Sequence, residues 1–237
     1  MIKYKQLTLI GTSHIAEQSI QEVRSAVEAE KPGIIAIELD KKRLAGLLDK
    51  SHKRLKLKEI FRLGVKAYLF ILIASYIQKK LGRIVGVDPG SEMLEAVKLA
   101  NKTKSQLALI DQDITITLYK FSKAFTWKER WNFFVDILKG LFFKKNQIKE
   151  LGIDTFDITK VPSKKVIAKL LKNVKMRYPS LYKVLIHDRN IVMAKKLVAL
   201  FKKFPNEKII AVVGAGHEDE IIKIIKKIDN SQIEFIS

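Results

Sequence analysis

The stretch LTLIGTSH, Leu7–His14, decides the fold prediction. It has the pattern of an apolar strand that reaches Gly11, with His14 three residues later. The stretch IIAVVGAGH, Ile209–His217, repeats this arrangement near the other end of the chain. With only 4 His and 11 Gly in 237 residues, two Gly-x-x-His tetrads that each follow an apolar strand are unexpected by chance. The pair predicts one site that brings His14 and His217 together.

Strands and helices alternate along the chain, which predicts an α/β fold with a central, mostly parallel sheet flanked by helices. A capping-box pattern at Ser19–Glu22 predicts a helix that Pro32-Gly33 ends, and Ile34–Leu39 is the next strand. The strands of such a βαβ unit are parallel, so their carboxyl ends meet at the edge where open α/β sheets bind ligands. Further strands are expected at 83–88, 106–110, 208–213 and 232–236, and a long helix at 179–203.

We expect one domain over residues 1–237, with a helical insertion around 114–175. Within the insertion, Trp127, Trp131, Phe134 and Leu138 follow helical spacing. Two interpretations stay open: an aromatic stripe packed on the core, or a basic amphipathic hairpin that rests on a membrane or covers the site. The apolar run Ala67–Ile77 is too short to span a bilayer and is predicted to be a buried helix.

Composition limits the partners. The formal net charge of +20 suits nucleic acid, an anionic membrane surface or an acidic ligand, and equally a lysine-rich surface that favours solubility. No nucleic-acid-binding motif is recognisable, so nucleic acid is not expected. The chain has no cysteine, so a metal would need His and carboxylate ligands. The N-terminus lacks the features of a signal peptide, and together these observations fit a reducing compartment such as the cytoplasm.

Two histidines and a carboxylate can hold a divalent ion and leave one position open for water. We predict His14, Glu38 and His217 as metal ligands and catalytic groups at the sheet edge. Alternatively, Glu38 is a general base that His14 orients, or one histidine only hydrogen-bonds a buried backbone group. Arg189 is expected to stabilise an oxyanion, and Asn190 either ties its helix to a loop or faces the site.

Glycines and further carboxylates surround these residues. Gly11, Gly214 and Gly216 permit sharp turns and a close approach of backbone to ligand, although the acidic run Glu218–Glu220 argues against a phosphate. Glu92 and Asp113 are the next candidates for ligand binding after Glu38. Other carboxylates near strand ends are expected to cap helices or to pair with Arg43 and Arg189. The set comprises Asp40, Asp88, Glu92, Asp111 and Asp113.

The chain resembles the TraB family of the Tiki/TraB/ChaN-like superfamily. The resemblance rests on six stretches, which keep the family's order along nearly the whole chain. They are GTSHIAEQSIQEVRSAVEAEKP, IAIELDKKR, GVDPGSEMLEAVKLA, LIDQDITITL, HDRNIVMAKKL and VVGAGHEDEI. By this resemblance, His14 and His217 match the paired family motifs, Glu38 matches the acidic position after the second strand, and Arg189-Asn190 matches the late helix.

The resemblance implies a metal-dependent hydrolase of peptide or amide bonds, with a signalling peptide as one substrate and Mn²⁺, Co²⁺ or Zn²⁺ as the cofactor. The alternative is a non-catalytic protein that sequesters a peptide pheromone or haem at the membrane surface. Expected partners are a peptide or small-molecule substrate, an anionic membrane surface and a second copy of the chain. Many archaeal relatives carry C-terminal transmembrane helices, which implies that this domain belongs to a longer, membrane-associated protein.

Overall fold

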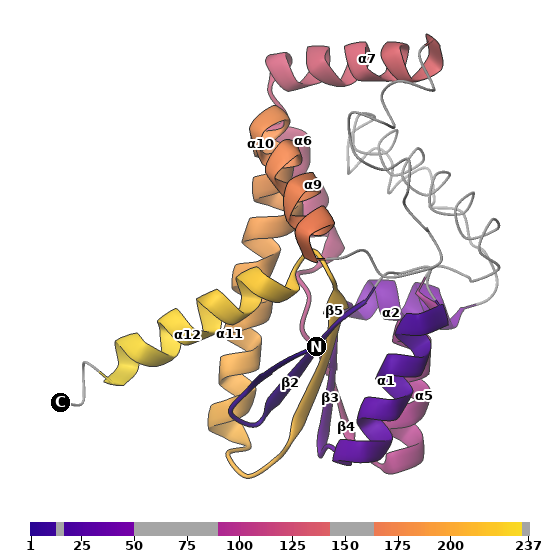
Figure 1. The fold of residues 1–237 in the computed structure, drawn as a ribbon, viewed down its shortest axis with the longest axis vertical. Helices are drawn as coiled ribbons and strands as arrows, with labels where there is room; N and C mark the ends of the chain where they lie inside the picture. The colour runs from indigo at the N-terminus through magenta and orange to yellow at the C-terminus, as the bar shows by residue number, and fades with distance from the viewer. Residues whose placement is uncertain (13–16, 50–89, 143–163, 234–237) are drawn as a thin grey trace.

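The computed structural model describes residues 1–12, 17–49, 90–142 and 164–233 (Figure 1). Its sheet contains five described strands in the order β1-β2-β5-β3-β4. Their bounds are β1 Ile2–Tyr4, β2 Leu7–Thr12, β3 Ile34–Ile37, β4 Gln106–Leu109 and β5 Ile209–Gly214. Only the β1–β2 pairing among them is antiparallel, and the other three pairings are parallel. The predicted α/β fold with a mostly parallel sheet is therefore confirmed.

Strand β5 lies at the centre of the sheet and pairs with both strands of the first βαβ unit, β2 and β3. Ile209 is the partner of Leu7 on one side and of Ile34 on the other. Every residue of β2, β3 and β5 is buried, which explains the continuous apolar runs in these strands. Because β2, β3, β4 and β5 run in the same direction, the residues that follow them share one edge of the sheet. We call it the carboxyl edge.

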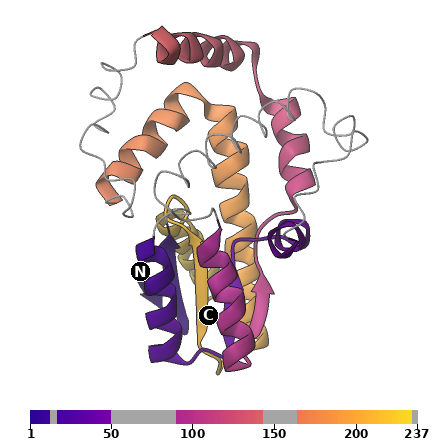
Figure 2. The same cartoon turned by 90° about the vertical axis from the view of Figure 1, so that its right-hand side faces the viewer.

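Helices cover both faces of the sheet. Helices α11, Asp188–Lys203, and α12, Glu218–Ile233, pack on one face through Met193, Leu197 and Ile221. Helices α1, Glu17–Glu30, and α5, Ser91–Thr103, cover the other face through Val23 and Met93. Figure 1 shows this three-layer arrangement, and Figure 2 shows α1 and α5 in front of the sheet. The short helix α2, Lys41–Leu48, follows β3 at the carboxyl edge.

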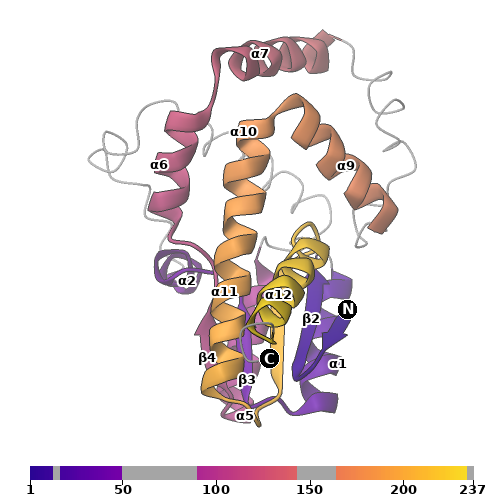
Figure 3. The same ribbon diagram turned by 90° about the vertical axis from the view of Figure 1, so that its left-hand side faces the viewer.

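A second group of helices lies beyond the carboxyl edge (Figures 1 and 3). We call this group the helical cap: α6 Ile114–Ala124, α7 Trp127–Phe142, α9 Lys164–Arg177 and α10 Pro179–Tyr182. A π-helical turn, η1, Lys183–His187, joins α10 to α11. The cap supplies the predicted helices in the region 114–175, while residues 143–163 lie outside the described part. That the whole chain is one domain stays a prediction.

Four details differ from the predictions. Residues 2–4 form an extra strand, β1, and Lys5 adopts a positive φ of 49° in the turn to β2. Helix α1 begins at Glu17, so Ser19 is buried inside it and the predicted capping box is wrong. The long helix expected at 179–203 contains the π turn η1. The strand expected at 232–236 is wrong for residues 232 and 233, which belong to α12.

The exposure of two tryptophans on α7 contradicts one interpretation of the aromatic stripe. The side chains of Trp127 and Trp131 are 80% and 67% exposed, so they do not pack on the core. The side chains of Phe134 and Leu138 lie outside the described part of the structure. None of the described helices is both long and apolar enough to cross a bilayer. Residues 67–77 and the strand expected at 83–88 are not described.

Candidate functional site

Glu38 lies at the centre of the carboxyl edge. It directly follows β3, and its backbone N–H donates to the carbonyl of Val212, which extends the parallel ladder by one residue. Its side chain is only 2% exposed. One carboxylate oxygen, Oε2, accepts a hydrogen bond of 2.6 Å from the backbone N–H of Gly214. The other, Oε1, accepts from Nη2 of Arg189. The last residue of β5 and the helix α11 therefore fix Glu38 from two sides.

Arg189 joins Glu38 to a second buried carboxylate, Asp111. Its Nε and Nη2 donate to the two oxygens of Asp111 at 2.9 and 2.8 Å, and its Nη1 donates to the carbonyl of Leu185 at 3.0 Å. Burial opposes the charge of the guanidinium, but Glu38 and Asp111 outweigh it and raise the pKa of Arg189. Four of the five N–H groups of the guanidinium thus donate to these partners.

Asp111 completes the ion-pair group. It follows β4 and accepts a hydrogen bond of 2.5 Å from Nη1 of Arg43, in α2. The predicted pairing of a strand-end carboxylate with Arg43 and Arg189 is confirmed, and Asp111 is that carboxylate. Lys196 lies beside it on α11 and donates to the backbone carbonyl of Asp111 at 2.6 Å. Burial lowers the pKa of Lys196, although the nearby carboxylates of Asp111 and Asp40 oppose the shift.

A second hydrogen-bonded chain begins at His217, which is 6% exposed. Its Nε2 lies 3.4 Å from Glu38 Oε1, and its Nδ1 lies 2.6 Å from Oδ1 of the fully buried Asn190. Nδ2 of Asn190 donates to Glu220 at 2.6 Å. Glu220 also accepts from Nδ1 of His187 at 2.5 Å. This series of hydrogen bonds runs from the carboxyl edge to the half-exposed side chain of His187.

The environment of Glu220 keeps this carboxyl ionised. Burial raises its pKa, but the hydrogen bonds from His187 and Asn190 outweigh burial, and the pKa falls below its usual value of 4.5. Glu220 stands one helical turn after His217, so both side chains lie on the same face at the start of α12. In the sequence, Glu220 stands out only as part of the acidic run Glu218–Glu220. The spacing from His217 is the signal that could have identified it.

Gly11, the glycine of the first motif, is required by the packing of the carboxyl edge. A side chain at Gly11 would bring a Cβ atom to 3.1 Å from Ala215 Cα and 3.1 Å from Glu218 Cδ. Gly11 therefore lets the turn after β5 pass close to β2. At Gly216, the nearest atom to such a Cβ would be a methyl group of Leu171 in α9, at 3.7 Å. The helical cap therefore lies directly over this turn.

The two other candidate carboxylates have structural partners. Asp113 caps α6 by accepting from the N–H of Thr115 at 2.7 Å, and it pairs with Lys42. Hydrogen bonds from Thr115 and Lys42 lower the pKa of Asp113 to about 2. Glu92 is buried in the first turn of α5, where the helix dipole favours a negative charge. Asp40 caps α2, as expected for some of these strand-end residues. Asp88 is not described.

His14 lies outside the described residues, so the predicted meeting of His14 with His217 stays a prediction. In the described part of the chain, no group of three His, Cys, Asp or Glu side chains is arranged to hold a metal ion. The structure does bring Glu38, Arg189, Asn190 and His217 together. Of these, Glu38 Oε1 and His217 Nε2 approach each other to 3.4 Å.

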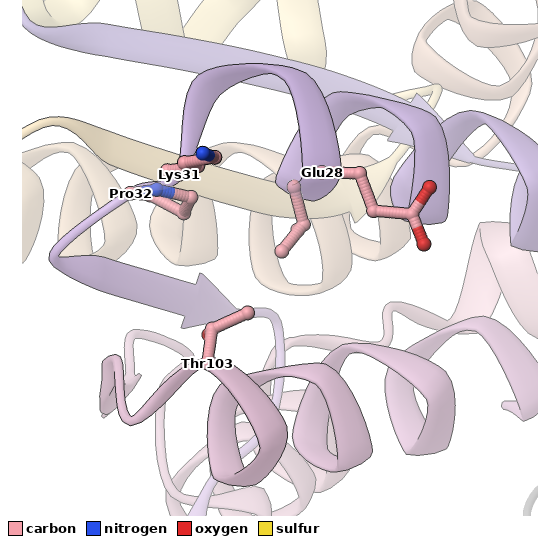
Figure 4. A pocket seen from close by; sticks show the side chains of 5 residues that line it. Glu28, Lys31, Pro32 and Thr103 are labelled. Carbon is pink, nitrogen blue, oxygen red and sulfur yellow. The ribbon is translucent and has the colours of Figure 1, made fainter.

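A cavity of about 340 Å³ lies at the opposite edge of the sheet (Figure 4). It is lined by residues near the carboxyl ends of α1 and α5, among them Lys31, Pro32 and Thr103. Pro32 comes just before β3, so the whole length of this strand separates the cavity from Glu38. The predicted site residues contribute nothing to its lining.

Comparison with known proteins gives two findings. The model of the TraB/PrgY/gumN family matches residues 2–234. An uncharacterized protein of Methanocaldococcus jannaschii is 36% identical over 225 residues, which is 94% of this chain. The same alignment covers 54% of that archaeal protein, so the chain spans about half the length of this relative.

Proposed function

The chain belongs to the TraB/PrgY/gumN family, and from this premise we propose that it is a metal-dependent hydrolase of peptide or amide bonds. The site is the carboxyl edge, with Glu38 and His217 at its centre. The observation that carries the proposal is the orientation of the His217 ring. The hydrogen bonds from His217 through Asn190 to Glu220 determine this orientation.

The orientation follows from which groups can donate. Glu220 has a lowered pKa and is a carboxylate at neutral pH, so it only accepts hydrogen bonds. The amide nitrogen of Asn190 must then face Glu220, and the amide oxygen must face His217. An amide oxygen only accepts, so Nδ1 of His217 carries the proton. In the neutral ring, Nε2 therefore presents a lone pair toward the Glu38 carboxylate.

Two acceptors 3.4 Å apart repel each other unless a positive charge lies close to them, and Arg189 supplies part of that charge at Oε1 of Glu38. A proton on Nε2 of His217 or a divalent ion would relieve the rest of the repulsion. Two ligands at about 2.1 Å from a tetrahedral ion are about 3.4 Å apart, so the separation suits adjacent metal ligands. The Asn190 carbonyl would be the outer partner that metal-bound histidines usually have. A third ligand must come from elsewhere, and His14 is our candidate.

The other residues would position and balance these groups. Arg189 and the Gly214 N–H each donate to one oxygen of Glu38, which favours a role as ligand or electrostatic partner over one as general base. Arg189 also competes with a metal for Oε1 of Glu38, so we expect weak metal binding. A bound ion would polarise the substrate carbonyl and acidify a water molecule.

Metal binding and hydrolysis test the proposal separately. Metal-free protein is titrated with Mn²⁺, Co²⁺ and Zn²⁺ by calorimetry, and cleavage is measured on a mixed peptide library. His217→Ala, Glu38→Gln and His14→Ala should each abolish cleavage and weaken metal binding. Asp229→Asn, a carboxylate exchange at a peripheral pair with Tyr4 and Lys5, is the control. A wild-type protein that binds no divalent ion and cleaves no peptide contradicts the proposal.

Burial favours a second candidate function. Glu38, Asn190 and His217 are all nearly inaccessible to solvent, and Arg189 already donates four of its N–H groups. Hydrolysis needs an attacking water molecule beside these groups, and their burial leaves little access for one, which favours binding of a peptide or haem without turnover. Binding of a metal or haem that depends on His217, with no cleavage of any peptide, would favour this second function over hydrolysis.

A further inference from the structure

Helix α7 has two different faces. The inward face carries Glu129, Phe133 and Asp136, which contact the rest of the cap. Glu129 accepts from the backbone N–H of Ser180 at 2.7 Å, and the rings of Phe133 and Tyr178 meet edge to face. The outward face carries Trp127 and Trp131, four residues apart and 80% and 67% exposed. The helix thus directs its carboxylates toward the protein and its largest apolar side chains toward solvent.

The charges near the two tryptophans are positive. Glu129 and Asp136 are the only acidic residues in the sequence of α7, and both have partners on the inward side. Lys128 is exposed beside Trp127, and the guanidinium of Arg130 lies over the Trp127 ring at 4.9 Å. At the end of α6, the ammonium of Lys123 lies over the exposed ring of Tyr119 at 4.4 Å. A cation therefore lies over each of the exposed rings of Trp127 and Tyr119.

We propose that the outward face of α7 binds the surface of an anionic lipid membrane. Trp127 and Trp131 would enter the headgroup region, where tryptophan is enriched because its ring is apolar and its N–H is polar. Lys123, Lys128 and Arg130 would lie at the level of the lipid phosphates, and each adds attraction to a negative surface. Exposed tryptophans next to cations are the combination that the surface of an anionic membrane favours.

The position of α7 allows such a contact. Figures 1 and 3 show α7 at the end of the molecule farthest from the sheet, where it can meet a flat surface without obstruction from the sheet layers. Bound in this way, the protein would hold the cap between the membrane and the carboxyl edge. This inference concerns a surface separate from Glu38 and His217, and it stands or falls independently of the proposed hydrolysis.

The test uses the two tryptophans themselves, because the sequence contains only these two. Vesicles of phosphatidylglycerol mixed with phosphatidylcholine should shift the fluorescence emission to the blue and carry the protein down on sedimentation. Vesicles of phosphatidylcholine alone should bind about tenfold less. The double variant Trp127→Ala/Trp131→Ala should lower the partition coefficient about tenfold or more. Lys123→Glu/Lys128→Glu should weaken binding and reduce its dependence on salt.

Two matched variants serve as controls. Leu48→Ala removes an exposed apolar side chain from α2, and Lys102→Glu reverses an exposed charge at the end of α5. Both should bind vesicles like the wild type, and circular dichroism should show that every variant is folded. The inference is wrong if the α7 variants bind as well as the wild type, or if anionic vesicles cause no shift. A blue shift without vesicles that grows with protein concentration, together with a dimer in sedimentation velocity, would assign the face to a second copy instead.

Discussion

The carboxyl edge and the outward face of α7 differ in whether their functional side chains are buried or exposed. At the carboxyl edge, Glu38 and Asp111 are buried and Arg189 is only 14% exposed, and each charge has partners of fixed geometry. On α7, the cations are at the surface and two tryptophans are exposed. Buried charges are costly when a partner is lost, whereas exposed groups contribute little to folding. We therefore expect the carboxyl edge to determine stability and chemistry, and α7 to determine association.

Removing a buried charge should have the largest effect on the free energy of unfolding. Glu38→Ala leaves the Gly214 N–H without its carboxylate and removes one of the two anions that neutralise Arg189, which should cost about 3–5 kcal/mol of unfolding free energy. Trp127→Ala should change stability by less than about 0.5 kcal/mol. Urea denaturation of both variants measures the contrast. Equal losses would show that α7 is part of the folding core.

Removing the Asn190 amide, which joins His217 to Glu220, should have an intermediate effect on the free energy of unfolding. Asn190→Ala leaves His217 Nδ1 and Glu220 without their shared amide, at a cost of about 1–3 kcal/mol. Nitrogen NMR of the histidine ring should show the Nδ1–H tautomer in the wild type and its loss in the variant. The exposed Asn101→Ala is the control, with an expected change below about 0.5 kcal/mol. An Nε2–H tautomer in the wild type would refute the orientation of His217 proposed above.

Two glycines offer a matched test of packing. Gly11→Ala forces a Cβ to within 3.1 Å of the backbone of Ala215, so it should destabilise by about 1–3 kcal/mol. Gly46 in α2 has no atom within 4 Å of such a Cβ, and Gly46→Ala should stabilise by about 0.5–1 kcal/mol through helix propensity. Thermal unfolding compares the two. A neutral result for Gly11→Ala would mean that the turn after β5 can move.

The smallest expected effect is the pH dependence at Glu220. Its folded pKa is below the ordinary value of 4.5, so its contribution to stability is present above pH 4.5 and is lost as the pH falls through the folded value. Glu220→Gln removes this contribution. The difference in unfolding free energy between wild type and variant should therefore shrink on going from pH 7 to pH 3. A constant difference would show that the charge of Glu220 does not matter.

The sequence predicted most of the sheet and part of the site for one physical reason. Strands buried on both faces have continuous apolar runs, and parallel strands place their following residues at one edge. These two facts predict that Glu38 and His217 lie together, and the structure confirms it. The pairing of a strand-end carboxylate with Arg43 and Arg189 followed from charge, and the structure identifies it as Asp111.

The predictions that the structure contradicts concern features that tertiary contacts determine. Helical spacing shows that Trp127 and Trp131 share a face, but it does not say which way the face points. The contacts of Glu129 with Ser180 and of Asp136 with Arg177 decide that, and these partners are distant in sequence. Likewise, the capping pattern at Ser19 is a local preference, and packing of α1 on the sheet overrides it.

The π turn Lys183–His187 has one consequence for how such a chain can vary. A turn of this kind holds one residue more than an ordinary helix would need. Deleting that residue would leave Arg189 and Asn190 on an unchanged helix, but it would rotate α10 by about 100° around the helix axis. A single-residue difference in length here would thus redirect the adjoining cap helices α9 and α10 while α11 and the sheet stay as they are. Relatives that share this sheet can therefore present quite different outer surfaces through one insertion or deletion.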